Sequence, residues 1–312
     1  MKRMHRLVDV HAHYVPDFYR RALIDSGNEF PDGSSIPVWD EESHMVRLKE
    51  LRLDAAVLSL SSPGVAGLTQ PMQMARRVNE YGRDVVRRHP GVFAYLACLP
   101  LPDVTASRNE AEWALTDGGA AGIGLLTNYN GTYLGAPDFE PLLETLNAHR
   151  ATVIIHPTSP PGSECLTSGR PSPVIEYLFE TTRAVTNLLL TESVARYPRI
   201  QWVVLHNGAA IPSVIDRVVM FAELLLDADV DPLAQLRSMT FEIGSSAPFP
   251  RTAQNIADLV GSEQLVLGTD TPYAPPQVVT KNISRILAGD LNQIVDISRI
   301  SATTARLFPT LI

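Results

Sequence analysis

Short apolar runs alternate along this chain with longer segments that are apolar on one side only. The runs have the length and β-branched content of strands buried on both faces. Eight such strands are predicted: Leu7–Val10, Ala55–Leu60, Val92–Leu99, Ala121–Leu126, Ala151–Ile155, Gln201–Leu205, Thr240–Ile243 and Gln264–Leu267. The segments between them have apolar residues at helical spacing. Helices are predicted over Glu41–Leu51, Gln73–Arg88, Ala106–Thr116, Phe139–Arg150, Pro173–Tyr197, Ile211–Leu226 and Thr252–Val260, with one or two closing helices in Gln277–Leu307.

This alternation predicts an α/β fold of the closed (β/α)8 type, the TIM barrel. An open doubly wound sheet is the second choice, but no GxGxxG follows the first strand. Pro16–Asp40 is too long for an ordinary strand-to-helix loop and contains Gly27, Pro31, Gly33 and Pro37. We predict a long loop insertion after the first strand, of the kind that often forms a functional lid. Because we find no repeat or linker, residues 1–312 are expected to form one domain.

The composition is that of an ordinary globular protein, with 45% hydrophobic and 19% charged residues in 312. The net charge is −8 and no basic stripe stands out, which argues against a nucleic-acid partner. No apolar stretch is long enough for a signal peptide or a membrane span, so no membrane association is expected. Cys98 and Cys165 are the only cysteines, which indicates a reducing compartment. The expected location is the cytoplasm.

His11 and His13 stand two residues apart at the end of the first predicted strand. The period of a strand points both side chains to the same side. Neutral imidazoles are good ligands for zinc and similar ions. By itself this pair is weak evidence for a metal site, because two polar residues on a strand-to-loop turn without any metal would give the same pattern.

Three further polar residues directly follow predicted strands. His156 follows the fifth strand, His206 the sixth and Asp270 the eighth. In a barrel these positions converge on the mouth at the carboxyl ends of the strands, where active sites lie. One histidine after a strand is usually structural, but four histidines and an aspartate on one rim are hard to explain in that way.

The motifs around these residues resemble the amidohydrolase superfamily. They read Val8-Asp9-Val10-His11-Ala12-His13, Ile155-His156-Pro157-Thr158, Leu205-His206-Asn207-Gly208 and Leu267-Gly268-Thr269-Asp270-Thr271-Pro272. The likeness is strongest to the branch of aminocarboxymuconate-semialdehyde decarboxylase and other non-oxidative decarboxylases. It implies that His11, His13, His156 and Asp270 bind one divalent metal ion, with Zn²⁺ expected and Mn²⁺ as the alternative. It also implies that His206 is an acid/base or orienting residue, and that Asp270 can move a proton as well.

Lysine usage is consistent with this branch. Many superfamily members bridge two metals with a carbamylated lysine on the fourth strand, but the lysines here are Lys2, Lys49 and Lys281. A lysine-bridged binuclear site is therefore not expected. Within the branch the chain is most similar to 6-methylsalicylate decarboxylase-type proteins. That similarity rests on residues 39–44, 58–64 and 122–138, and on the prolines after His156.

The chain departs from the branch pattern at three positions. Ala209 stands where a second glycine is usual, and Glu242 where the seventh strand usually carries an aspartate. Glu242 has no role that the sequence can assign. His44 occupies the neighbourhood in which some branch members hold the substrate carboxylate with an arginine. Contact with the substrate and a buried structural role are both open for His44.

The expected activity is decarboxylation of a small aromatic or muconate-like carboxylic acid such as 6-methylsalicylate, the small-molecule partner of the site. Trp39, Tyr129 and Phe249 are candidates to stack on a substrate ring, together with His44 as a substrate contact. The alternative is a metal-dependent hydrolase of a lactone or amide, because the same ligands can activate a water molecule. A non-enzymatic metal-binding protein is a third hypothesis. By analogy with the branch, a homodimer is expected.

Overall fold

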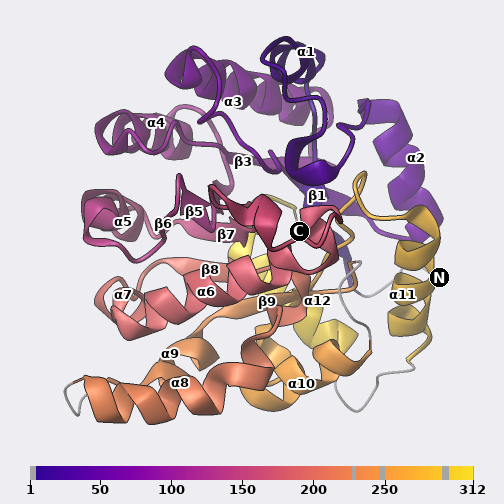
Figure 1. The fold of residues 1–312 in the computed structure, drawn as a ribbon. Coiled ribbons are helices and arrows are strands. Elements are labelled where there is room, and N and C mark those ends of the chain that lie inside the picture. Colours follow the sequence, from indigo (N-terminus) through magenta and orange to yellow (C-terminus); the bar gives the residue numbers. More distant parts are fainter. Residues whose placement is uncertain (1–4, 227–229, 246–249, 290–294, 312) are drawn as a thin grey trace.

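Eight parallel strands form one sheet that curls into a barrel surrounded by helices (Figure 1). The computed structural model describes residues 5–226, 230–245, 250–289 and 295–311. Along the sheet the strands are β1 (Val8–His13), β2 (Ala55–Ser59), β3 (Phe93–Ala97), β4 (Gly122–Leu126), β7 (Thr152–His156), β8 (Gln201–Val204), β9 (Thr240–Ile243) and β10 (Leu265–Leu267). All eight coincide with predicted strands.

The seam of the barrel lies between β1 and the segment that follows β10. The backbone N–H of His13 donates to the carbonyl of Thr271 at 2.8 Å, and that of Asp270 donates to the carbonyl of His11 at 2.6 Å. An isolated parallel bridge also joins Ala12 to Thr271. The first and last strands are thereby joined, and the predicted (β/α)8 barrel is confirmed.

A bulge in β1 sets the direction of its histidines. Asp9 pairs with Ala56 and Ala12 with Leu58, so β1 uses three steps where β2 uses two. One extra residue therefore sits in β1, a feature that often re-aims side chains near active sites.

The helices cover the outside of the barrel, and the end of the chain closes the barrel at the amino ends of its strands. They are α1 (Asp17–Asp25), α2 (Glu41–Leu51), α3 (Pro71–Arg88), α4 (Val104–Thr116), α5 (Glu140–Ala148), α6 (Glu176–Leu190), α7 (Ser193–Arg196), α8 (Ile211–Leu225), α9 (Pro232–Ser238), α10 (Arg251–Val260), α11 (Pro276–Ala288) and α12 (Ile297–Leu307). Phe308 and Leu311 pack with Val8, Ile154 and other strand residues in one apolar cluster. This plug at the amino ends of the strands leaves the carboxyl ends free to form a site.

Two predicted segments differ from the structure. The loop insertion over Pro16–Asp40 contains α1, because Tyr19 and Leu23, four residues apart, are both buried. The helix predicted over Pro173–Tyr197 is broken after Leu190, where Glu192 adopts a left-handed conformation with φ 55°. The closing segment Gln277–Leu307 contains two helices, α11 and α12, in agreement with the predicted one or two. A short hairpin of β5 (Asn128–Tyr129) and β6 (Thr132–Tyr133), together with α9, was not predicted.

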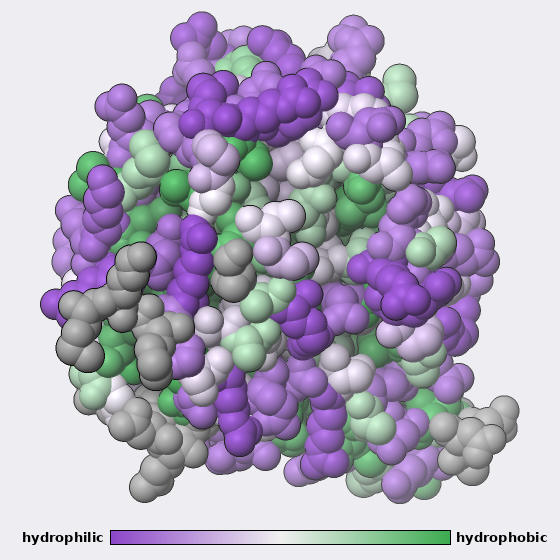
Figure 2. Space-filling view, turned by 180° about the vertical axis from the view of Figure 1, so that it is seen from behind, coloured by the Kyte–Doolittle hydropathy of each residue, from purple (hydrophilic) through white to green (hydrophobic). Residues whose placement is uncertain are grey.

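The surface behind the view of Figure 1 is dominated by hydrophilic residues, with hydrophobic ones in small separate patches (Figure 2). Within the part of the chain that the structure describes, no helix is both long and apolar enough to cross a membrane.

Candidate active site

Three histidines and one aspartate converge at the mouth of the barrel. His11 and His13 come from β1, His156 ends β7, and Asp270 follows β10. One potential ligand atom from each lies within 4.8 Å of the others. The Nε2 atoms of His11 and His13 are 3.1 Å apart, and Oδ1 of Asp270 lies 3.4 Å from the first and 3.1 Å from the second. The structure thus brings together all four residues predicted to bind a metal.

Each of these histidines has an acceptor at its other ring nitrogen. Nδ1 of His11 lies 3.3 Å from Oε2 of Glu242, and Nδ1 of His13 lies 3.2 Å from the carbonyl of Ser59. Nδ1 of His156 lies 2.7 Å from the carbonyl of Pro157. Because the acceptors hold the proton on Nδ1, the three Nε2 atoms face the centre with free lone pairs. This arrangement is typical of metal-binding histidines.

The electrostatics of the cluster fit a cation at its centre. Burial, followed by the charges of neighbouring histidines, lowers the pKa of His156 well below its usual value, so the ring is neutral near pH 7. Burial would raise the pKa of Asp270, but the neighbouring imidazoles of His11 and His13 outweigh it and hold that pKa well below its usual value, so Asp270 is a carboxylate. Three nitrogen lone pairs and a carboxylate that converge in this way repel one another unless a positive ion lies between them. The donor set therefore suits a single divalent metal ion.

Glu242 on β9 is fully buried beneath this cluster. Its carboxylate also accepts hydrogen bonds from the backbone N–H of His206 at 2.9 Å and from Ser245. The neighbouring Gly268 makes room for it, since a Cβ there would lie 2.4 Å from Cγ of Glu242 and 2.5 Å from Cβ of His11. Glu242 thus orients a candidate ligand and the loop that carries His206. A charged residue inside an apolar strand was the available signal, but the sequence could not name its partners.

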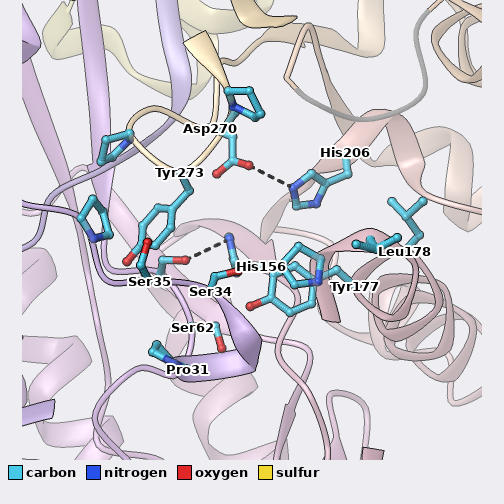
Figure 3. A pocket seen from close by; sticks show the side chains of 17 residues that line it. Pro31, Ser34, Ser35, Ser62, His156, Tyr177, Leu178, His206, Asp270 and Tyr273 are labelled. Carbon is cyan, nitrogen blue, oxygen red and sulfur yellow. Dashed lines mark hydrogen bonds and ion pairs between the residues drawn. The ribbon is translucent and has the colours of Figure 1, made fainter. Parts of the chain in front are cut away.

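His206 stands beside Asp270 on a strained turn. Its Nε2 lies 3.8 Å from Oδ2 of Asp270, and the two side chains face each other in Figure 3. Among the described residues, Nδ1 of His206 has no hydrogen-bond partner although it is buried. His206, Asn207 and Ala209 all have positive φ, at 58°, 55° and 55°. Such strain is typical of functional sites.

A cavity of about 590 Å³ opens above these residues. Its size is within the range of small-molecule sites. Tyr177 and Tyr273 lie on its walls, and Asp270 and His206 approach from another side (Figure 3). It is lined by Pro31, Ser34, Ser35, Pro37, Ser61, Ser62, His156, Pro173, Val174, Tyr177, Leu178, His206, Asp270, Pro272, Tyr273, Ala274 and Pro275. Several lining residues belong to the segment after β1, so the predicted loop insertion forms part of the cavity wall.

The residues predicted to contact the substrate lie elsewhere. His44 is buried on α2, where Trp39 Nε1 donates to its Nδ1 at 3.1 Å. The hydroxyl of Tyr129 accepts from the backbone N–H of Leu126 at 3.0 Å. None of these three lines the cavity, so their contact with a substrate stays a prediction. Phe249 lies outside the described residues. The sequence analysis missed Tyr177 and Tyr273, although Tyr273 lies only three residues after Asp270.

Comparison with known proteins identifies the family. The amidohydrolase family model matches residues 8–283. The chain belongs to the amidohydrolase family. It is 32% identical to the decarboxylase yanB of Aspergillus niger, over 97% of this chain and 87% of that protein. It is 28% identical to 6-methylsalicylic acid decarboxylase of Penicillium expansum, over 97% of this chain and 96% of that protein.

The fold is also that of a solved structure, 5-carboxyvanillate decarboxylase of Novosphingobium aromaticivorans complexed with manganese and 4-hydroxy-3-methoxy-5-nitrobenzoic acid. The TM-score is 0.84 at 19% identity, over 98% of this chain and 96% of that one. The comparisons confirm the predicted family, and the names of the relatives agree with the predicted class of enzyme, a decarboxylase.

Proposed function

We propose that this chain is a metal-dependent decarboxylase that removes CO2 from a small hydroxybenzoate such as 6-methylsalicylate. The observation that carries the proposal is the convergence of four potential ligands beside a cavity that also contains His206. The relatives named as decarboxylases support this reaction over others of the family. Zn²⁺ is the proposed metal and Mn²⁺ the alternative, because a site of three histidines and one aspartate suits either.

We assign His11, His13, His156 and Asp270 as the metal ligands. A divalent ion held there would bind the substrate carboxylate and a neighbouring phenol oxygen, and so orient the ring.

Asp270 and His206 are placed to supply the proton that the reaction needs. Loss of CO2 leaves an electron pair on the ring carbon, so that carbon has to be protonated by a nearby acid. In our proposal His206 first passes a proton from solvent to Asp270, which holds it only briefly because its pKa is low. Asp270 then delivers this proton to the carbon that bears the carboxylate. The bond to the carboxyl carbon then breaks, its electron pair restores the aromatic ring, and CO2 leaves. His206, 3.8 Å away, supplies the next proton to Asp270 in the same way.

The test is an assay of the metal-loaded protein with 6-methylsalicylate. We expect equal amounts of CO2 and 3-methylphenol, loss of activity after chelation, and recovery with Zn²⁺ or Mn²⁺. Hydrolysis of a lactone or amide without any release of CO2 would overturn the proposal in favour of a hydrolase. For the site itself, His11→Ala should lose bound metal while His149→Ala, a change at an exposed histidine, should keep it. Unchanged metal content in His11→Ala would refute the ligand assignment.

A further inference from the structure

Tyr177 on the cavity wall is held by an aspartate of the loop after β1. Its hydroxyl donates a hydrogen bond to Oδ2 of Asp32 at 2.7 Å. Ser62, which also lines the cavity, donates to the same oxygen at 2.5 Å. Asp32 itself lies in the short turn Pro31–Gly33 in a left-handed conformation with φ 53°. The three residues therefore tie the loop after β1 to α6 and to the end of β2.

The polarity of these hydrogen bonds is fixed by the carboxylate. An ionised carboxylate can only accept. The hydroxyl of Tyr177 is the donor in its 2.7 Å hydrogen bond to Oδ2 of Asp32. Because the phenol proton is donated to Asp32, the Tyr177 oxygen can form a further hydrogen bond only as an acceptor. Ser62 also donates its only proton to Asp32, so in its 2.7 Å contact with Thr158 Oγ1 it can only accept.

Asp32 has no lysine or arginine partner within the part of the chain that the structure describes. None of the ion pairs among the described residues includes Asp32, and no lysine or arginine is among the residues that line the cavity. A neutral hydroxyl that enters this part of the cavity finds an acceptor. A substrate carboxylate at this place would face two acceptors, Tyr177 and Ser62, and the negative charge of Asp32, and neither hydroxyl could donate to it.

We propose that Tyr177 determines substrate specificity by accepting a hydrogen bond from a neutral donor on the substrate ring, with Asp32 as its positioning residue. The same pair disfavours a second carboxylate at that ring position. The inference rests on the proposed function in one respect, namely that the ligand is an aromatic carboxylate. It concerns recognition, and it can be tested without turnover.

The test is calorimetric binding to the metal-loaded protein in a His206→Asn background, which suppresses turnover. The probes are salicylate and its relatives with a second hydroxyl at position 3, 4, 5 or 6. We expect one isomer to bind about five- to tenfold more tightly than salicylate, the effect of one net hydrogen bond. Tyr177→Phe should abolish this gain. Tyr133→Phe is the matched control, because it removes an equivalent hydrogen bond to Glu180 of α6, at 2.6 Å, outside the cavity.

The charge is tested separately with Asp32→Asn, since asparagine tolerates the left-handed conformation. The probes are 2-hydroxyterephthalate and 4-hydroxyisophthalate, which are salicylates with an added carboxylate. Their affinity relative to salicylate should rise severalfold in Asp32→Asn and stay unchanged in Tyr133→Phe.

Equal binding of all the hydroxybenzoates, a gain that survives Tyr177→Phe, or an unchanged dicarboxylate ratio in Asp32→Asn would overturn the inference. These outcomes are independent of the reaction. If the isomer preference is found but the wild-type protein releases no CO2, the proposed activity fails and the recognition by Tyr177 stands. If CO2 is released but no isomer is preferred, the proposed activity stands and the recognition by Tyr177 fails.

Discussion

Replacing Glu242 by glutamine should weaken metal binding and destabilise the fold at the same time. The two carboxylate oxygens accept from Nδ1 of His11, from the backbone N–H of His206, and from the backbone N–H and hydroxyl of Ser245. In Glu242→Gln the NH2 end of the side-chain amide can only donate, and only the remaining oxygen can accept. Whichever way it turns it faces at least one of these donors, because Oε1 faces the Ser245 N–H and Oε2 faces the other three.

The magnitude follows from the loss of one buried hydrogen bond and of the charge. Leaving a buried donor without an acceptor costs about 1–3 kcal/mol in the free energy of unfolding. Loss of the carboxylate that orients a metal-binding histidine typically weakens metal binding by about 10- to 100-fold. The effect on metal arises because His11 is then held less firmly with Nε2 toward the other ligands.

Metal affinity is measured by competition with a chromophoric chelator, and stability by urea unfolding of the metal-free protein. Glu110→Gln is the control. Glu110 is also a buried carboxylate, which accepts from Arg76 at 2.9 Å and Asn79 at 2.8 Å on the outer helices. The Glu110→Gln variant should be less stable than the wild type but should keep the wild-type affinity for metal. Wild-type metal affinity in Glu242→Gln, or an equal loss in Glu110→Gln, would refute the reasoning.

Three further predictions concern other parts of the site. His206→Asn should lower kcat by about 100-fold or more yet bind metal normally, and loss of metal would contradict its assigned role. Ala209→Gly should raise the free energy of unfolding by about 1 kcal/mol, because alanine is strained at φ 55° and ψ −127°; a lower midpoint of thermal unfolding would contradict this. Burial, then the charge of His13, lowers the pKa of His44 from 6.5 to about 4, so the unfolded state binds the extra proton between these values. The wild type should therefore lose about 3 kcal/mol from this group as the pH falls from 6.5 to below 4, and metal-free His44→Gln should lose less. Parallel stability–pH curves from urea unfolding would rule this out.

The strands and the candidate ligands were predictable because the signal for each is local. A parallel strand buried on both faces is a continuous apolar run, and a polar residue such as His156 at its end marks the mouth of the barrel. The number of such runs fixed the fold class. His11 and His13 were ambiguous alone and became informative only with the other strand ends.

The groups that orient the ligands could not be predicted in the same way. The acceptors for His13 and His156 are the backbone carbonyls of Ser59 and Pro157, and every residue has such a carbonyl. Tyr177 reaches the cavity from a helix whose first turn is placed by contacts with the loop after β1. The helix α1 was hidden by the glycines and prolines that follow it in sequence. For His13 and Tyr177 the decisive contact joins segments distant in the chain.

The candidate ligands also span the seam of the barrel. His13 and Asp270 are 257 residues apart in sequence, and they stand on either side of the junction between the first and last strands. An ion bound by both, as proposed, would act as a cross-link that closes almost the whole chain into a loop. Because unfolding separates the two residues, the unfolded chain cannot hold the ion in this way, and binding stabilises the folded state alone. At a metal concentration about a thousandfold above Kd, binding would add about 4 kcal/mol to the free energy of unfolding. Metal supply would then set how stable the folded barrel is as well as whether it reacts.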